Sequence, residues 1–379
     1  MTDEKGPIVW IAGVGWDDLT GTDKRIVLEL GRLTDVLWVD SPRRGGWLKW
    51  GSDRRSGEEV APGVRRLRIP GLPGFSRAPI RAFTRATADF AIRRALGTTT
   101  RAQAIILANP IAHFPTRVDG TRVFYVTDDW IAGADLMSYS RGSIKRAVTH
   151  NLGTADLLAA VTPRLVKRMQ ALGGSTVKPP AILLPNGAPE VLVPNDMTRL
   201  PIAGVVGQLN ERLDLTVLEA VVESGIALRL IGPRTEREPE FGRRLDLLIA
   251  NEAVQWTGRV PCGELGAHLG TLAVGLTPYA DNDFNRASFP LKTLEYLAAG
   301  VPVVSTDLPA SRWIDSEDVE IPSSLADFTA AVLRRVESVS DPESARVTAG
   351  QCRALARHHR WERRADQLLN AIDLKNTKH

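Results

Sequence analysis

Short apolar runs that alternate with helical segments are the feature of this chain that most restricts its fold. In the first half, the runs cover Pro7–Gly13, Asp35–Val39, Ala104–Leu107 and Val123–Val126. A second series covers Ile202–Val206, Ala227–Ile231, Val254–Thr257 and Leu272–Leu276. Short runs of this kind, bounded by turn residues, are typical of buried strands in a parallel sheet with helical crossovers. We therefore expect an α/β chain.

Length and proline placement predict where the domains divide. A chain of 379 residues exceeds what one ordinary hydrophobic core supports, so two domains are expected. Pro189, Pro194 and Pro201 punctuate the segment between the two series of strands. We expect an N-terminal domain over residues 1–187, a linker over 188–200, a C-terminal domain over 201–355 and a closing helix over 356–379.

Charge is distributed unevenly along a chain of otherwise globular composition. Hydrophobic residues make up 43% and charged residues 24%, and no apolar run approaches the ~18 residues of a membrane span. Residues 1–186 contain 27 Lys and Arg against 17 Asp and Glu, whereas residues 187–379 contain 21 against 27. This asymmetry suggests that the first half meets an anionic partner, such as a membrane surface, a lipid phosphate or nucleic acid.

The cysteines and the N-terminus favour a reducing, cytoplasmic location. Cys262 and Cys352 are far apart, and neither lies in a metal-ligand spacing, so we expect no structural zinc. The opening residues, MTDEKGPIVW, are polar and acidic, unlike a signal peptide.

The stretch Ser288–Ser305, SFPLKTLEYLAAGVPVVS, predicts a helix that ends at a glycine and is followed directly by a buried strand. Ser288 is a candidate N-cap for this helix. A helix N-terminus suits an anion, and Lys292 adds a full positive charge in the first turn. Glu295 could accept two hydroxyl hydrogen bonds, as a ribose offers. The alternative is an ordinary amphipathic helix in which Lys292 and Glu295 form an ion pair.

This stretch resembles the donor-binding motif of glycosyltransferases that have the two-Rossmann-domain B fold, including family 4 and bacterial polysaccharide-type members. The resemblance implies that Lys292 holds the diphosphate of a nucleoside diphosphate sugar and that Glu295 holds its ribose. The segment GQLNERLD after Val206 resembles the family's first C-domain loop, which implies diphosphate contacts from Gly207 and Arg212. The same resemblance places the nucleobase near Gly258 and Val260.

Candidate acceptor-side residues follow the strands of the first half. Gly13 and Gly15 form a turn after the first strand, but Asp18 stands where a dinucleotide fingerprint needs glycine. Asp128 and Asp129 follow the strand at 123–126, at the sheet edge where α/β domains place chemistry. Either aspartate could take a proton from an acceptor hydroxyl or simply cap a helix.

The resemblance covers nearly the whole chain and implies a function. Asp129 matches the base of some inverting members, whereas His113 is the nearest match to a histidine that many retaining members use. We expect two Rossmann-like domains facing across a cleft, with the closing helix crossing back to the first. The expected reaction moves a sugar from the donor to a hydroxyl of a glycan, lipid-linked or small-molecule acceptor, without a metal or other cofactor.

Three other functions stay open at this point. A sugar-nucleotide epimerase would share the fold and the donor site, and a non-catalytic scaffold would keep the fold alone. A nucleic-acid-binding module is the third, although the chain contains no recognition motif for it and we expect no such partner. The Asp281–Asp283 segment spells D-x-D, the metal motif of another glycosyltransferase fold, and we interpret it as a polar loop.

Tryptophans and arginines of the first half suggest peripheral contact with the inner face of a membrane. Trp47 and Trp50 lie near a helix on which Arg77, Arg81 and Arg85 recur every four residues. The alternative is a solvated arginine face above an ordinary core, to which Phe83 and Phe90 would belong.

Overall fold

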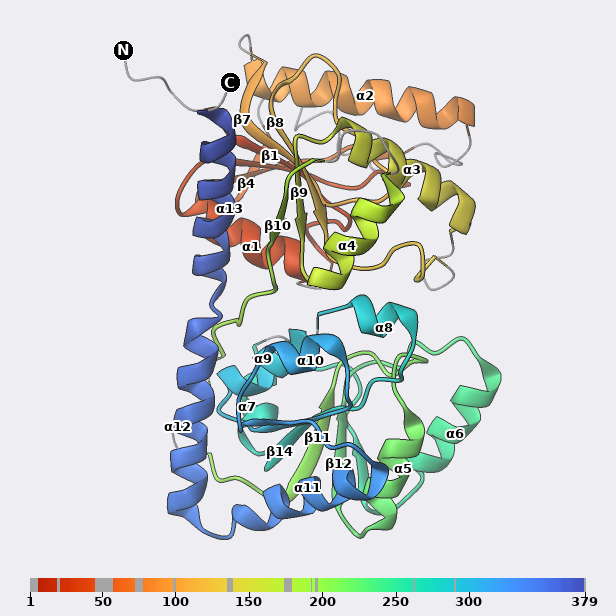
Figure 1. The fold of residues 1–379 in the computed structure, drawn as a ribbon, viewed down its shortest axis with the longest axis vertical. Coiled ribbons are helices and arrows are strands. Elements are labelled where there is room, and N and C mark those ends of the chain that lie inside the picture. Colours follow the sequence, from red (N-terminus) through yellow and green to blue (C-terminus); the bar gives the residue numbers. More distant parts are fainter. Residues whose placement is uncertain are drawn as a thin grey trace. The chain divides into compact units, whose positions relative to one another are not determined.

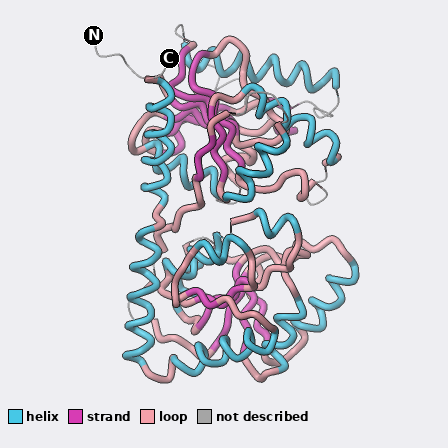
Figure 2. The backbone as a smooth tube through the Cα atoms, in the orientation of Figure 1, coloured by secondary structure: helices cyan, strands magenta, loops and turns pink. Residues whose placement is uncertain are grey.

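The chain forms two compact units, Met1–Asn186 together with Trp361–His379, and Gly187–Arg360. We call them the N-unit and the C-unit. The computed structural model describes residues 6–18, 21–44, 57–71, 78–97, 100–134, 139–173, 179–191, 193–194, 197–261, 263–289 and 291–377. In Figures 1 and 2, each unit is a sheet flanked by helices.

An eight-stranded sheet forms the centre of the N-unit, in the order β10-β9-β8-β7-β1-β2-β5-β4. All pairings are parallel except that of β4 with β5. The strands are β1 (Ile8–Ile11), β2 (Val36–Val39), β4 (Glu58–Ala61), β5 (Val64–Leu67), β7 (Arg101–Leu107), β8 (Asp119–Val126), β9 (Leu157–Ala160) and β10 (Ala181–Leu183). A separate small pair joins β3 (Arg43–Arg44) to β6 (Pro70–Gly71).

Helices pack on the N-unit sheet through faces that the sequence makes apolar. They are α1 (Thr22–Gly31), α2 (Ala78–Leu96), α3 (Arg141–Thr154), α4 (Pro163–Leu172) and α13 (Trp361–Asn376). The closing helix α13 buries Trp361, Ala365, Leu368 and Ile372 along one face and packs against α1. It begins at Trp361 rather than at residue 356, because the chain leaves helical geometry at His359 and Arg360.

The C-unit contains a six-stranded parallel sheet in the order β13-β12-β11-β14-β15-β16. Its strands are β11 (Ile202–Val206), β12 (Ala227–Ile231), β13 (Val254–Trp256), β14 (Val274–Thr277), β15 (Val303–Ser305) and β16 (Val319–Glu320). Its helices are α5 (Leu215–Glu223), α6 (Pro239–Ile249), α7 (Leu265–Gly270), α8 (Asp283–Ala287), α9 (Leu291–Ala298), α10 (Pro309–Trp313), α11 (Leu325–Ser338) and α12 (Pro342–His358). Residues 188–200, expected as a separate linker, belong to this unit.

Each sheet has a point at which the strand order reverses. In the C-unit, the chain adds β12 and β13 on one side of β11 and then returns to add β14 on the other. In the N-unit, β2 lies on one side of β1 and β7 lies on the other. Ligands of open α/β sheets bind outside the carboxyl ends of the strands at such points. The loops after β11 and β14, and after β1 and β7, are therefore the places to look for a site.

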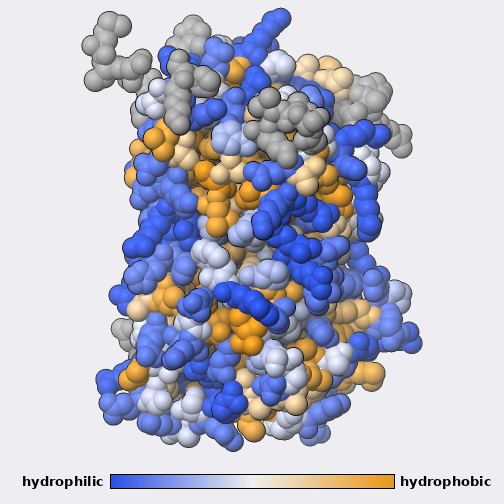
Figure 3. All heavy atoms as spheres, viewed as in Figure 1, coloured by the Kyte–Doolittle hydropathy of each residue, from blue (hydrophilic) through white to orange (hydrophobic). Residues whose placement is uncertain are grey.

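The prediction of an α/β chain with two parallel-sheet domains is confirmed by these topologies. Within the part of the chain that the structure describes, no helix has both the length and the apolar character to cross a bilayer. The face drawn in Figure 3 is mainly hydrophilic, with hydrophobic residues in smaller patches between.

Candidate functional site

A buried tyrosine separates the two strands at the reversal point of the C-unit. β11 and β14 pair only through Ala203–Val274 and Gly204–Gly275. Beyond that pair, the Tyr296 hydroxyl accepts a hydrogen bond from the Val206 N–H at 2.7 Å and donates to the Gly204 carbonyl at 3.1 Å. The ring needs the glycine in β14, because a Cβ on Gly275 would lie 2.4 Å from it. Tyr296 therefore connects helix α9 to the last residue of β11.

Two glycines let the loops after β11 and β12 approach each other closely. Gly207 follows β11 with φ +141°, and its N–H donates to the Ile231 carbonyl at 2.9 Å. Gly232 has φ +147°, and a Cβ there would lie 1.8 Å from the Gly207 carbonyl oxygen. Both conformations belong to a backbone region that is essentially restricted to glycine. The start of the loop after β11 is thus packed closely against the loop after β12, and Gly207 offers bare backbone where a ligand could approach.

Helix α9 places Lys292 and Glu295 beside that loop. Lys292 Nζ forms an ion pair with Glu295 Oε2 at 2.6 Å, and Glu295 is only 2% exposed. A Cβ on Gly207 would lie 3.6 Å from Lys292 Cε, so the lysine side chain runs past the loop. The ion pair expected for a surface helix is present at the carboxyl edge of the sheet, with the Glu295 side chain 3% exposed and the Lys292 side chain 27% exposed. A buried carboxylate needs such a partner, so Lys292 compensates the charge of Glu295 in this structure.

The residues before α9 form a second short helix that the sequence did not predict. Ser288 is the C-cap of α8, and its hydroxyl donates to the Phe284 carbonyl at 3.0 Å. The prediction that Ser288 caps the donor helix is therefore wrong, since α9 starts only at Leu291.

Arg212, in the loop after β11, packs against α8. Its Nε donates to the Asn285 side-chain oxygen at 3.1 Å, and Asn285 returns a hydrogen bond to the Arg212 carbonyl at 3.0 Å. The guanidinium carbon lies 4.9 Å from the Phe284 ring centre and 5.3 Å from that of Tyr279. No carboxylate among the described residues forms an ion pair with Arg212. The site thus holds a positioned cation that an anionic ligand could neutralise.

The predicted nucleobase residues follow β13. Gly258 has φ +68° and open space where a Cβ would lie, and Val260 is half-buried. Trp256, at the end of β13, is 40% exposed and donates from its indole Nε1 to the Gly232 carbonyl at 2.9 Å. The loops after β11, β12 and β13 therefore meet along one edge of the C-unit sheet.

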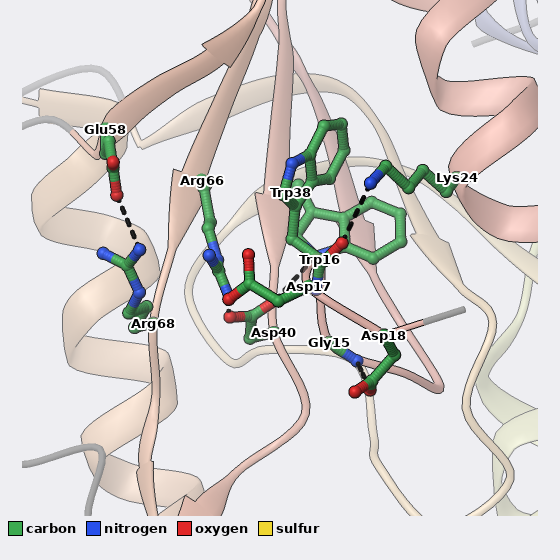
Figure 4. A network of polar contacts seen from close by, with 10 residues as sticks. All are labelled: Gly15, Trp16, Asp17, Asp18, Lys24, Trp38, Asp40, Glu58, Arg66 and Arg68. Atoms are coloured by element: carbon green, nitrogen blue, oxygen red, sulfur yellow. Dashed lines mark hydrogen bonds and ion pairs between the residues drawn. The ribbon is translucent and has the colours of Figure 1, made fainter. Parts of the chain in front are cut away.

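A polar network fixes the Gly13–Asp18 loop of the N-unit (Figure 4). The Gly15 N–H donates to Asp18 Oδ2 at 2.8 Å, and the Trp16 N–H donates to Asp40 Oδ1 at 3.0 Å. Asp40 also accepts from the Trp38 indole at 2.8 Å. Its other oxygen accepts from Arg66 Nε at 2.8 Å, and both of these side chains are 5% exposed. The expected acceptor loop is consequently held by a buried ion pair between the ends of β2 and β5.

Lys24 and Asp17 also take part in this network (Figure 4). Lys24 Nζ donates to the Trp16 carbonyl at 3.0 Å and lies 4.6 Å from the Trp16 ring centre. Arg66 donates through its second nitrogen to Asp17 at 2.8 Å, and the Asp17 side chain is 70% exposed. Sequence reasoning missed this network because it joins four separate segments.

Asp129 is completely buried and already paired. Its Oδ2 forms an ion pair with Arg168 Nε of α4 at 2.7 Å, and its Oδ1 accepts from the Ala132 N–H at 3.0 Å. Neighbouring Asp128 is half-buried and accepts from the Thr127 hydroxyl at 3.1 Å. The catalytic role assigned to Asp129 stays a prediction, although this geometry also suits a purely structural carboxylate.

His113 faces a carboxylate rather than an open site. Its Nε2 lies 3.7 Å from Asp89 Oδ1, and the His113 side chain is 17% exposed. Burial and the charge of Arg85 lower the pKa of His113 to about 4, against the opposing effect of Asp89. The imidazole is therefore neutral at physiological pH.

Asp23, which sequence reasoning did not select, lies beneath the Gly13 turn. It stands in the first turn of α1 and is 8% exposed. Its Oδ2 accepts from the Gly13 N–H at 3.3 Å. Burial is the main cause that raises the pKa of Asp23 to about 7, with a smaller contribution from the charge of Asp128 and against the effects of the Gly13 hydrogen bond and the nearby Trp10 side chain. The sequence shows only an acidic residue ten positions after a glycine turn. That pattern is too common to identify Asp23 as a candidate site residue.

A metal site is not apparent among the described residues, which hold no group of three or more His, Cys, Asp or Glu suited to a metal ion. Asp281 of the D-x-D segment pairs with Arg286.

Comparisons with known proteins agree with this architecture. Residues 201–338 match the family model described as Glycosyl transferases group 1. A putative teichuronic acid biosynthesis glycosyltransferase, TuaH of Bacillus subtilis (strain 168), is 32% identical over 113 residues. That match spans 29% of this chain and 28% of the relative's length.

Two solved structures share the fold over nearly the whole chain. Sucrose-phosphate synthase from Thermosynechococcus elongatus superposes with a TM-score of 0.70 at 15% identity, covering 99% of this chain and all of that one. Anabaena HepE, in complex with UDP and glucose, gives 0.67 at 13% identity, covering 97% and 99%. Residues 201–338 therefore match a glycosyltransferase group 1 model, and the chain shares the fold of these two solved structures.

Proposed function

We propose that this protein transfers a sugar from a nucleoside diphosphate sugar to a hydroxyl group of a glycan or lipid-linked acceptor. The observation that carries the proposal is the position of Lys292, which runs past Gly207 at the reversal point of the C-unit sheet. A diphosphate at this edge would meet an ammonium group and the bare backbone of Gly207.

Charge neutralisation would be the main contribution of the C-unit to the reaction. The bond between the sugar and the diphosphate breaks with its electron pair on the diphosphate, so negative charge grows there in the transition state. Lys292 and Arg212 are the two cations that we assign to this charge. Glu295 would accept hydrogen bonds from the ribose hydroxyls, as the sequence predicts. Since two protein cations serve the leaving group, we expect activity to persist in excess EDTA.

The nucleobase and sugar are proposed from the relatives. HepE is described in complexes with UDP and glucose and with UDP-glucose, so we propose a uridine diphosphate sugar of the glucose type as donor. The base would lie near Gly258 and Val260. A thermal-shift comparison of UDP, GDP and ADP tests this choice, and a larger shift with GDP or ADP would overturn it.

The acceptor is proposed to be a growing polysaccharide at the inner face of the membrane. The relative TuaH is named for teichuronic acid biosynthesis, and the N-terminal half of this chain is the basic one. On α2, Phe83 is 60% exposed and Phe90 is 53% exposed. They are seven residues apart and therefore lie on the same helical face. Their exposure contradicts the alternative in which they belong to an ordinary core.

Exposed phenylalanines on a helix with four arginines and one aspartate suit an anionic bilayer surface. Trp47, Trp50 and Arg77, the other residues expected to contact the membrane, lie outside the described residues. Cosedimentation with phosphatidylglycerol vesicles should weaken at least severalfold in a Phe83→Ser/Phe90→Ser variant. The matched control is Leu247→Ser, which removes a 75% exposed apolar side chain from α6 of the C-unit. Equal binding of both variants would refute membrane contact through α2.

The proposed activity is tested by incubating the protein with UDP-glucose, with and without a membrane-extracted glycan acceptor. Acceptor-dependent release of UDP together with transfer of labelled glucose supports the proposal. Conversion of the donor sugar without any acceptor would instead identify an epimerase. Binding of UDP without turnover under either condition would identify a non-catalytic scaffold.

A further inference from the structure

A buried carboxylate lies directly beneath the exposed turn that follows the first strand. Gly13 is exposed, and its N–H donates to Oδ2 of Asp23 at 3.3 Å. Gly13 lies at the reversal point of the N-unit sheet, where β1 has β2 on one side and β7 on the other. A substrate held at this edge would therefore come within one residue layer of the Asp23 carboxylate.

The surroundings of Asp23 supply a hydrogen bond from Gly13 and a nearby Trp10 side chain but no opposite charge among the described residues. No lysine or arginine among the described residues forms an ion pair with it. Asp128 faces it from the loop after β8, Trp10 from β1 and Tyr125 from β8, and Arg364 of α13 acts on Tyr125. Burial is the largest reason why the pKa of Asp23 rises to about 7. A carboxylate with this value is a stronger proton acceptor at neutral pH than an ordinary aspartate.

Asp129 differs from Asp23 in each property that a base requires. Its side chain is 0% exposed, and its Oδ2 lies 2.7 Å from Arg168 Nε. The Asp129 carboxylate is therefore already engaged by a guanidinium of α4. A base also has to reach the substrate, and only Asp23 lies under an exposed glycine.

Gly13 keeps the approach to Asp23 short. A Cβ on Gly13 would lie 2.9 Å from the Ala108 carbonyl oxygen and 3.9 Å from Asp23 Oδ2. A side chain at this position would therefore stand between the carboxylate and the solvent side of the turn.

From this arrangement, and resting on the proposed function, we propose that Asp23 is the general base of the transfer reaction. The acceptor oxygen forms a bond to the anomeric carbon, and the bond from that carbon to the diphosphate oxygen breaks with its electron pair on the diphosphate. The proton of the acceptor hydroxyl passes to the Asp23 carboxylate, which later releases it to solvent. Attack opposite the leaving group gives a product with inverted anomeric configuration.

The test compares Asp23→Asn with Asp129→Asn and with a matched control, Asp35→Asn, which changes an exposed carboxylate just before β2. We expect Asp23→Asn to lower kcat by roughly 10²–10⁴-fold, the contribution of a general base, with the UDP Kd unchanged within twofold. The wild-type kcat/KM should fall below about pH 7, where the base becomes protonated, and the product should be inverted. Asp35→Asn should retain full activity.

Two results would overturn this role separately from the proposed function. If the wild-type protein transfers sugar while Asp23→Asn keeps more than a tenth of its kcat, Asp23 is not the base. If Asp129→Asn loses activity while Asp23→Asn keeps it, Asp129 is the base instead. If the wild-type protein neither binds UDP nor transfers sugar, the proposed function fails and the role of Asp23 falls with it.

Discussion

Replacing Asp23 by asparagine should stabilise the N-unit at alkaline pH while it slows transfer. Asparagine has the shape of aspartate and can still accept the Gly13 hydrogen bond through its side-chain oxygen. It cannot ionise, so it removes the cost of holding a charge in a buried place without an ion-pair partner among the described residues. A residue kept for catalysis at the expense of stability shows this combination.

The magnitude follows from the pKa of Asp23, which burial raises from 3.8 to about 7. Below pH 3.8 the carboxyl is protonated in both states and has no effect on stability. Between about pH 4 and pH 7 the unfolded chain loses this proton and the folded chain keeps it, so the free energy of unfolding falls as the pH rises. At about 1.4 kcal/mol per unit, the total loss is roughly 4 kcal/mol, of which about 2.5 kcal/mol falls between pH 5 and pH 8.

Urea unfolding followed by tryptophan fluorescence at pH 5 and pH 8 measures this difference. The stability advantage of Asp23→Asn over the wild type should be about 2.5 kcal/mol larger at pH 8 than at pH 5. Asp35→Asn, on an exposed carboxylate, should show no such change. An advantage of Asp23→Asn that is the same at both pH values would refute the raised pKa and the reasoning built on it.

Further predictions concern three other side chains. Asp129→Asn should lower the free energy of unfolding by about 1–3 kcal/mol at pH 7, because Arg168 loses its ion-pair partner, and a urea titration that shows stabilisation would contradict this. Tyr296→Phe should cost about 1–3 kcal/mol and weaken UDP binding, since the Val206 N–H is left unsatisfied; unchanged unfolding and calorimetry would count against it. Arg199 donates to backbone carbonyls at the ends of α7 and α9, so Arg199→Ala should cost about 2–3 kcal/mol, and an unshifted urea midpoint would contradict that anchoring role.

The sheets could be predicted because their strands are continuous apolar runs. Val36–Val39 and Val303–Ser305, for example, are buried on both faces and therefore spell a hydrophobic sequence. β5 escaped prediction because its sequence, Val-Arg-Arg-Leu, reads as polar. Its Arg66 is buried only because Asp40, 26 residues earlier, supplies the opposite charge. Local sequence does not reveal such a distant partner.

Some residues of the candidate site could be predicted from the sequence, and others could not. Lys292 and Glu295 were predictable because they stand three apart on one helix, where spacing fixes their proximity. Asn285, which holds Arg212, was missed because α8 has only five residues and follows a loop. Asp23 was missed because burial, rather than residue type or spacing, gives its carboxyl an unusual pKa.

The most direct measurement for the donor site is calorimetric titration of UDP into the wild type, Lys292→Ala and Arg243→Ala. Arg243 is the matched control, a 73% exposed cation of the C-unit that pairs with Glu240. A Lys292→Ala/Glu295→Gln variant removes both charges and shows whether the loss of affinity persists when the buried carboxylate is also replaced. A lysine that binds the diphosphate predicts a UDP Kd weaker by roughly 10- to 150-fold in both Lys292 variants and an unchanged value for Arg243→Ala. Equal UDP affinity in the wild type and Lys292→Ala would contradict the central claim.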